Sequence, residues 1–241
     1  TRFSIATGRL TEAGTVRLRV AAAREDQPYQ LKADGPVSLD EDVLAWQGEF
    51  EITPLGENGD SGLRGVASER TGLPVWTKGK YRLVPARLDL SELELEIGSR
   101  EDPFVLSGQG TADLQGQNGF RLQLDGRQID VARIAQMRGS EDGVSTLEER
   151  IALVRGILDE VPVPAINGVL DFEIPAIVSG DTMLREISTV VQPDSRRWKV
   201  RRLKATLPGN TVLEFSGSVG KGDDFGIDGN LLIASRQPSG L

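Results

Sequence analysis

Hydrophobic and polar residues alternate one by one along most of the chain. Val16, Leu18 and Val20 fall on one side of an extended segment, with an arginine between each pair. The same alternation recurs in FRLQLDG (residues 120–126) and SELELEIG (residues 91–98). Each run is short and ends at, or close to, Gly, Pro, Asn or Asp. This pattern is typical of antiparallel strands with one apolar and one solvated face.

Residues 203–219 read as two such strands joined by the turn Pro208-Gly209-Asn210. Unbroken apolar strands that each precede a helix, as a parallel sheet requires, are absent from the sequence. We therefore predict a mostly β protein with an antiparallel sheet of about 14 to 18 strands, if the strands have ordinary lengths.

Two segments near the middle of the chain have helical spacing instead. Apolar residues recur every three or four positions over Thr146–Glu160, which predicts a helix. Ser145, just before this segment, and Glu148, in its first turn, have the S-x-x-E spacing of a capping box. A second, shorter helix is predicted for Ile129–Met137. The predicted organisation is a first β-rich part (1–128), a helical hairpin (129–164) and a C-terminal β-module (165–241), with one continuous elongated domain as the alternative.

The two β-rich parts resemble one another at two places. Residues 80–88 match residues 197–205 without gaps, and residues 102–108 match residues 223–229 in the same order. Any amphipathic strand that ends in a turn glycine gives a weak match of this kind. Two matches at similar spacing favour a repeated β-module.

Composition narrows the possible chemistry. The net charge is −8, which repels nucleic acid, and the absence of His and Cys excludes His-based triads, zinc sites and disulfides. The acidic clusters at 39–43 and 222–225 lack the ligand spacing of a calcium loop, so we predict no metal, no cofactor and no catalytic residues. No apolar run is long enough to span a membrane. Because the chain starts directly on strand-like alternation, without Met or a leader, we expect it to be a piece of a longer protein.

The C-terminal half resembles the AsmA-like family, the bacterial periplasmic proteins of the AsmA and TamB type. The resemblance rests on W-x-V-x-x-L-x-A-x-LPG at residues 198–209, a following F-x-G strand, and a final F-x-I-x-G-x-L strand at residues 225–231. The segment LSGQGTADLQGQNGFRLQLDGRQIDVARI (residues 106–134) resembles the family's recurring strand, turn, strand and short ID-x-x-R-I element. The resemblance covers residues 81–241.

The resemblance implies a periplasmic protein held by an inner-membrane helix that would precede residue 1. It also implies an extended, curled antiparallel sheet, similar to a groove or half-barrel, whose apolar face carries phospholipid acyl chains between membranes or serves outer-membrane assembly. The alternative is a structural or adhesive β-solenoid or β-sandwich with a closed core. A glycosidase that uses two carboxylates is a third reading, disfavoured because aromatics are only 5% of the chain.

Two groups of residues are candidates for lipid contact. The predicted groove-lining residues are Leu122, Leu124, Leu213, Phe215, Phe225, Ile227 and Leu231. The predicted headgroup or interface residues are Arg197, Trp198, Lys199 and Arg201, from a basic segment in an otherwise acidic chain. The plainer reading of the first group is packing against another layer, and that of the second is a solvated charged face.

Overall fold

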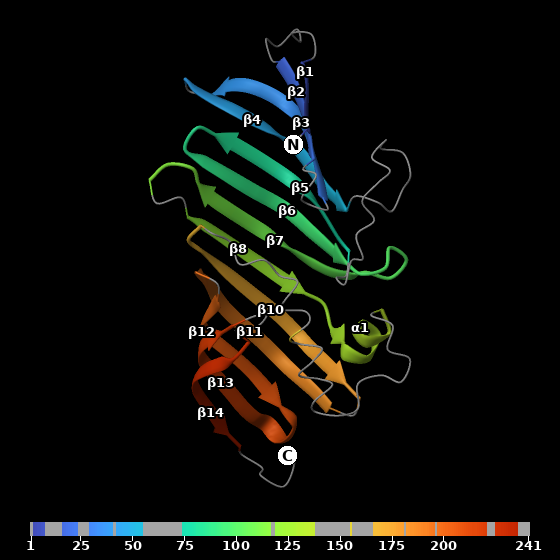
Figure 1. The fold of residues 1–241 in the computed structure, drawn as a ribbon, viewed down its shortest axis with the longest axis vertical. Helices are drawn as coiled ribbons and strands as arrows, with labels where there is room; N and C mark the ends of the chain where they lie inside the picture. The colour runs from blue at the N-terminus through green and yellow to red at the C-terminus, as the bar shows by residue number, and fades with distance from the viewer. Residues whose placement is uncertain are drawn as a thin grey trace. The chain divides into compact units, whose positions relative to one another are not determined.

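The computed structural model describes residues 2–7, 16–23, 29–40, 42–54, 74–116, 119–137, 155, 166–180, 182–195, 197–220 and 225–235. Within these ranges the chain forms fourteen strands and one α-helix, which confirms the predicted mostly β fold (Figure 1). The strands belong to two compact units, Thr1–Asn118 and Gly119–Leu241, called here the N-terminal and C-terminal units.

The N-terminal unit is an antiparallel meander in which each strand pairs with the next strand of the chain. Its strands are β1 (Arg2–Thr7), β2 (Val16–Ala23), β3 (Tyr29–Asp40), β4 (Val43–Pro54), β5 (Val75–Val84), β6 (Arg87–Ile97) and β7 (Phe104–Asp113). Short turns such as the one at Pro85 and Ala86 join neighbours, as expected for consecutive antiparallel strands.

The C-terminal unit begins with a parallel pair that the alternation did not predict. Strand β8 (Phe120–Gly126) runs parallel to β10 (Gly168–Ser179), and the two-residue β9 (Ile129–Asp130) also pairs with β10 in parallel. From β10 the unit continues as an antiparallel meander. Its further strands are β11 (Thr182–Asp194), β12 (Arg197–Leu207), β13 (Thr211–Val219) and β14 (Ile227–Ala234). Neither unit closes into a barrel through its described strands.

The connection between β8 and β10 explains the parallel pairing. Parallel neighbours need a long crossover, and the segment predicted as a helical hairpin lies between these two strands. Its first predicted helix, Ile129–Met137, is confirmed over Val131–Met137 as α1, whereas Ile129–Asp130 form β9. The amide N–H of Ala132 donates a hydrogen bond to the Asp130 carboxylate at 2.9 Å, which caps the helix. The second predicted helix, Thr146–Glu160, lies outside the described residues except for Arg155, which is helical.

The unit boundary and the repeat differ from the sequence-based division. Strand β8 falls in the C-terminal unit, because its partner is β10, whereas the pattern alone placed it with residues 1–128. The match between residues 80–88 and 197–205 compares a hairpin, β5–turn–β6, with the single strand β12. The ungapped match therefore does not pair equivalent positions, since a turn interrupts only one of its two segments.

β-Bulges preserve the alternation where the apolar spacing slips from two residues to three. In β6, Glu92 is an extra residue with φ 49°, so Leu90 and Leu93 pair with Gly110 and Gly108 of the same β7 face. In β12, the extra residue lies between Val200 and Leu203, which keep their partners on one face of β13. Each bulge returns the apolar residues to a common side of the sheet.

Candidate functional site

The last two strands of the C-terminal unit place most of the predicted groove residues on one face. Directly opposite residues of an antiparallel pair lie on the same side of the sheet. The opposite pairs along β13 and β14 are Leu213 with Ile233, Phe215 with Leu231, Gly217 with Gly229, and Val219 with Ile227. Apart from the glycine pair, this row consists entirely of large apolar side chains.

The same face continues through the other strands of the unit. On β12 it includes Trp198, Val200, Leu203 and Ala205, which pair with this row of β13. At the other end of the unit, Leu122 and Leu124 of β8 pair with Leu170 and Phe172 of β10. Strand β11 links the two ends, because Val191 pairs with both Leu170 and Val200. We call this surface, from β8 to β14, the apolar face of the C-terminal unit.

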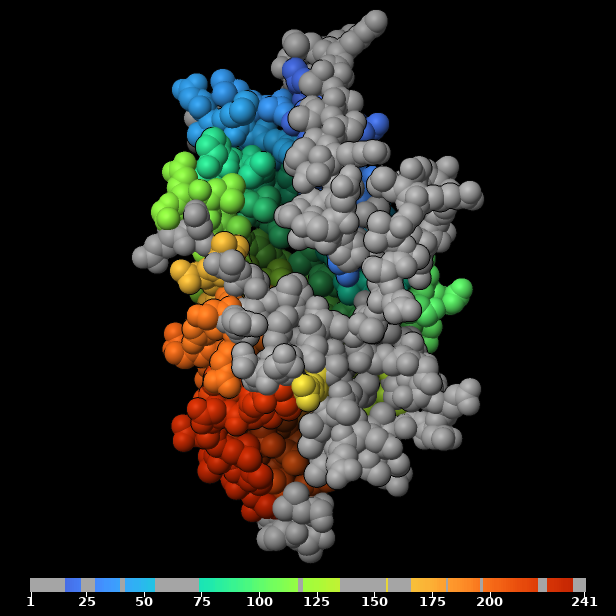
Figure 2. Space-filling model, viewed as in Figure 1, coloured from blue at the N-terminus to red at the C-terminus, as the bar shows by residue number. Residues whose placement is uncertain are grey.

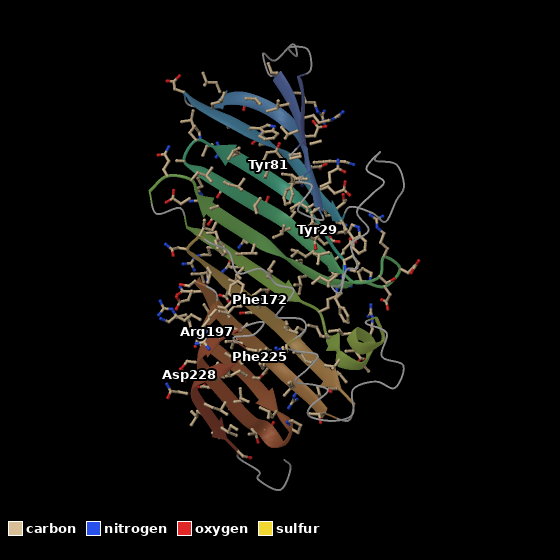
Figure 3. All side chains as sticks on the ribbon, viewed as in Figure 1. Tyr29, Tyr81, Phe172, Arg197, Phe225 and Asp228 are labelled. Carbon is tan, nitrogen blue, oxygen red and sulfur yellow. The ribbon has the colours of Figure 1, made fainter. Side chains whose placement is uncertain are left out.

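Six of the seven predicted groove residues therefore share one face, and the seventh is separate. Phe225 precedes β14 and has no ladder partner. Its ring lies 5.3 Å from the guanidinium carbon of Arg155 (Phe225 and Phe172 are labelled in Figure 3). Phe172 and Ile233 lie on the same face but were not among the predicted groove residues, although both continue the period-two alternation of their strands.

Exposure changes across this apolar face. Leu124, Trp198 and Val200 are only 4%, 6% and 8% exposed, whereas Ile227, Leu231 and Ile233 on β14 are 66%, 60% and 53% exposed. Figure 2 shows the C-terminal strands, orange to red, at the surface. The face is thus packed at its interior strands and open to solvent along β14, where large aliphatic side chains are left uncovered.

The glycine pair on this face is covered by a neighbouring ring. A Cβ atom on Gly229 would come within 2.9 Å of the Cε2 atom of Phe215 and 2.2 Å of the Ser216 carbonyl oxygen. A Cβ atom on Gly217 would come within 2.1 Å of the Asp228 carbonyl oxygen. The two strands therefore approach closely only because neither position has a side chain, and the Phe215 ring fills the gap.

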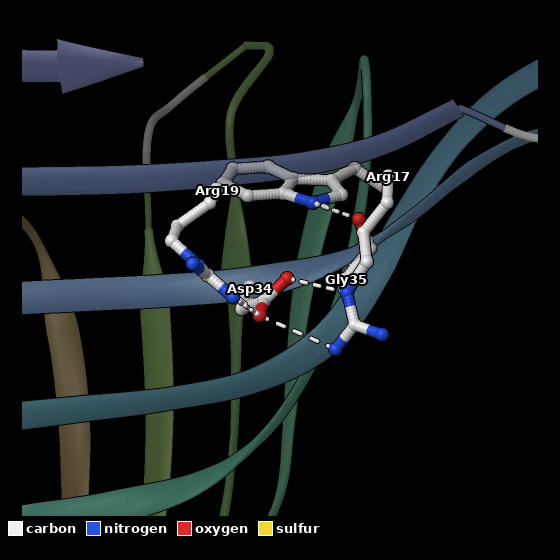
Figure 4. A network of polar contacts seen from close by, with 5 residues as sticks. Arg17, Arg19, Asp34 and Gly35 are labelled. Atoms are coloured by element: carbon white, nitrogen blue, oxygen red, sulfur yellow. Dashed lines mark hydrogen bonds and ion pairs between the residues drawn. The ribbon is translucent and has the colours of Figure 1, made fainter. Parts of the chain in front are cut away.

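The N-terminal unit has an apolar face of its own, centred on an aromatic cluster that the sequence analysis did not identify. The rings of Trp46 and Tyr81 meet edge to face at 4.9 Å, and Phe50 lies 6.5 Å from Tyr81. The indole Nε1 of Trp46 donates a hydrogen bond to the Gly35 carbonyl oxygen at 3.2 Å (Figure 4). Gly48 of β4 lies directly opposite Tyr81 of β5. Trp46 and Phe50 are two residues before and after Gly48 on the same face of β4, so their rings lie on either side of Tyr81.

Tyr81 is 7% exposed, and burial raises the pKa of its phenol well above the ordinary value, with a smaller contribution from the charge of Asp34. Its hydroxyl has no hydrogen-bond partner among the described residues. This cluster is a packed part of the apolar face. By contrast, Leu39, Val43 and Leu44, around the β3–β4 turn, are 69%, 44% and 57% exposed.

The polar face of the N-terminal unit is neutralised by ion pairs. Asp34 accepts hydrogen bonds from Arg17 Nε at 2.8 Å and from an Arg19 terminal nitrogen at 2.9 Å (Figure 4). These two guanidinium groups lower the pKa of the Asp34 carboxyl to about 2. On β5, Lys78 and Lys80 likewise pair with glutamates of β6.

The predicted headgroup residues divide between the two faces of β12. Trp198 lies on the apolar face and is buried, whereas Lys199 and Arg201 are exposed on the opposite face. Arg197 is partly buried, and its Nε atom has no hydrogen-bond partner among the described residues. The buried Trp198 ring therefore lies on the other face of the sheet from Lys199, because successive side chains of a strand point to opposite faces.

Within the described ranges, no group of three or more acidic side chains is placed to hold a metal ion. None of the described helical residues forms a segment with the length and hydropathy of a transmembrane span. Comparison of the chain with family models, with curated proteins and with solved structures found no match.

Proposed function

We propose that this chain is a non-enzymatic module that holds lipid acyl chains against an apolar sheet face. In this proposal it belongs to an AsmA-like protein of the bacterial periplasm, anchored in the inner membrane, and contributes to phospholipid transport between membranes or to outer-membrane assembly. The family assignment rests on the sequence motifs alone.

One observation carries the proposal: the apolar face of the C-terminal unit runs in register from β8 to β14 and ends on uncovered aliphatic side chains. Burying one such side chain is worth roughly 1.5–3 kcal/mol. Contact with an acyl chain would bury these side chains without requiring hydrogen bonds or ion pairs. The opposite face of β13 and β14 is mostly polar, with residues such as Glu214, Ser216 and Asn230, although Leu232 on that face is also 59% exposed.

The second candidate is an interaction module with a closed core. It is favoured by the near-complete burial of Leu124, Trp198 and Val200 on the same face. In that reading the exposed side chains of β14 belong to the edge strand of a packed layer, and the apolar face does not bind lipid.

Native mass spectrometry of the chain purified from bacteria, combined with glutamate substitutions, separates the two candidates. For lipid transport we expect co-purified phospholipid, and we expect Ile227→Glu to reduce it while the protein stays folded. Ile227 is exposed, so a new charge there keeps its water. Phe215→Glu should also reduce lipid, with a larger loss of stability because its ring packs on Gly229.

Asn230→Glu is the matched control, since Asn230 lies on the same strand but pairs with Ser216 on the polar face. It should leave the lipid content unchanged. Absence of lipid from the wild-type protein under several extraction conditions would favour the closed module. If both Phe215→Glu and Ile227→Glu prevent folding, these residues belong to a closed core and do not line an open surface. Unchanged lipid content in both folded variants would exclude both positions from the lipid site.

A further inference from the structure

Strand β12 has a row of exposed cations on the face opposite Trp198. Lys199, Arg201, Arg202 and Lys204 are all exposed, and we call them the basic stripe. The β-bulge between Val200 and Leu203 accounts for their density, because it adds one residue to the strand while keeping the flanking apolar positions on the other face. Two adjacent arginines are thereby solvent-exposed together.

The cations of the basic stripe have few carboxylate partners among the described residues. Lys204 has a carboxylate partner, Glu214, only at 3.9 Å. Arg201 donates its Nε hydrogen to a neutral acceptor, the Gln192 amide oxygen, at 2.7 Å. Lys199 and Arg202 have no ion pair with any residue in the described ranges.

The N-terminal unit provides the contrast. There Lys78 contacts Glu94 and Glu96 at 2.9 Å, and Lys80 contacts Glu92 at 2.6 Å. The two lysines of β5 are therefore paired with carboxylates of the next strand, whereas Lys199 and Arg202 of the basic stripe are not paired with any carboxylate of the described residues.

The strands on both sides of the stripe leave its charge uncompensated. Opposite Lys199 are Gln192 of β11 and Ser218 of β13, and opposite Arg202 is Val190. Only the pair Lys204 and Glu214 opposes unlike charges. The net charge of −8 belongs to the whole chain, and salt screens contributions from beyond about 8 Å at physiological ionic strength. The four cations of the stripe are therefore directly opposed by one carboxylate, that of Glu214.

We propose that the basic stripe docks the C-terminal unit onto an anionic lipid bilayer. Long cationic side chains along a strand match a layer of phosphate headgroups through charge alone, without fixed geometry. A protein partner fits less well, because protein interfaces depend on buried aromatic anchors, and the nearby aromatic residue, Trp198, points to the other face. The docking face is opposite the apolar face, so this proposal does not depend on whether the latter carries lipid.

Co-sedimentation of the full chain with preformed vesicles tests the proposal. The vesicles are phosphatidylcholine alone or phosphatidylcholine with about one third phosphatidylglycerol. We expect binding only to the anionic vesicles, and we expect it to weaken at about 0.5 M salt. Each removed charge should lower the partition coefficient about fivefold, so the triple variant Lys199→Gln, Arg201→Gln and Arg202→Gln should lose roughly a hundredfold.

Two control variants keep the test specific. The triple variant Lys32→Gln, Arg121→Gln and Arg127→Gln removes the same charge from exposed positions outside the stripe and should bind as the wild type does. The exchange Lys199→Arg, Arg201→Lys and Arg202→Lys keeps the charge and should retain binding. Equal losses in the two Gln triples would overturn the proposal. So would binding to soluble polyglutamate with none to anionic vesicles, which would indicate an acidic protein partner instead.

Discussion

Two residues of the N-terminal unit, Tyr81 and Asp34, have side-chain pKa values shifted by their surroundings. Tyr81 places a phenol in the aromatic cluster with Trp46 and Phe50, and its burial disfavours the ionised form. Asp34 is at the opposite extreme, because Arg17 and Arg19 both stabilise its charge. Both effects are properties of one side chain and its direct neighbours, so each can be tested by a single substitution.

Replacing Tyr81 by Phe should leave stability at neutral pH unchanged or raise it by up to about 1 kcal/mol, because a buried hydroxyl without a partner is removed. The phenol pKa is raised in the folded state. The folded protein therefore keeps a proton that the unfolded chain loses above about pH 10, and stability declines as the pH rises through that range. Tyr81→Phe should reduce this decline, measured by urea unfolding between pH 8 and pH 11.

The chain has two tyrosines, so the Tyr29→Phe variant leaves Tyr81 as the single phenol. Its ultraviolet titration should begin only well above pH 10 and become ordinary in urea. Titration of the folded variant near pH 10 would contradict the buried placement of Tyr81.

Asp34 predicts an acid-side effect. Its pKa is lowered from 3.8 to about 2 in the folded state. Its contribution to stability is therefore complete above the ordinary carboxyl pKa and is lost as the pH falls through about 2. Asp34→Asn should flatten the pH dependence of the melting temperature between pH 4 and pH 2. Asp228→Asn, at an exposed position on β14, removes the same charge and is the matched control; equal flattening by both would contradict the Arg17 and Arg19 pairing.

At the scale of the element, strand identity follows from alternation, and the bulges follow from its interruptions. Leu90 and Leu93, and likewise Val200 and Leu203, are three residues apart with two polar residues between them. That spacing is a readable signal for an extra residue. The turn Pro208–Asn210 between β12 and β13 was also predictable, because Pro, Gly and Asn are typical turn residues. In the structure Gly209 adopts φ 71°, a conformation that favours glycine. The parallel partner of β8 was not predictable, because strand pairing across a long connection leaves no trace in local alternation.

The close approach of β13 and β14 predicts a sharp effect at Gly217. Gly217→Ala should destabilise the pair by about 1–3 kcal/mol, because the new Cβ atom would meet the Asp228 backbone at 2.1 Å. Hydrogen exchange of β14 amides, followed by mass spectrometry, should accelerate. Gly119→Ala is the control, since its Cβ atom would meet only the Asn167 carbonyl oxygen at 3.8 Å and should change stability by less than about 0.5 kcal/mol. Exchange rates equal to wild type in Gly217→Ala would mean that the strands are further apart.

At the scale of the molecule, the pattern predicted the one-sided sheets and which residues share a face, but not how exposed each residue is. Leu124 and Ile227 lie on the same apolar face at 4% and 66% exposure, although both alternate identically in the sequence. The exposure of a side chain depends on which residues cover its face of the sheet and on whether its strand has one neighbouring strand or two. Period-two spacing carries no information about either. For the same reason the sequence suggested lipid-contact residues without separating core positions from open ones.

The parallel pairing of β8 with β10 has a consequence for how the protein folds during synthesis. Each strand of the N-terminal meander pairs with the preceding or the next strand of the chain, so this unit can assemble progressively as the chain emerges. Strand β8 ends at Gly126, and its partner β10 begins only at Gly168. Closing that loop costs chain entropy before any contact compensates for it. Formation of the β8–β10 pair is therefore the slow step expected for the C-terminal unit, and a ribosome stalled before residue 168 should expose β8 without this partner.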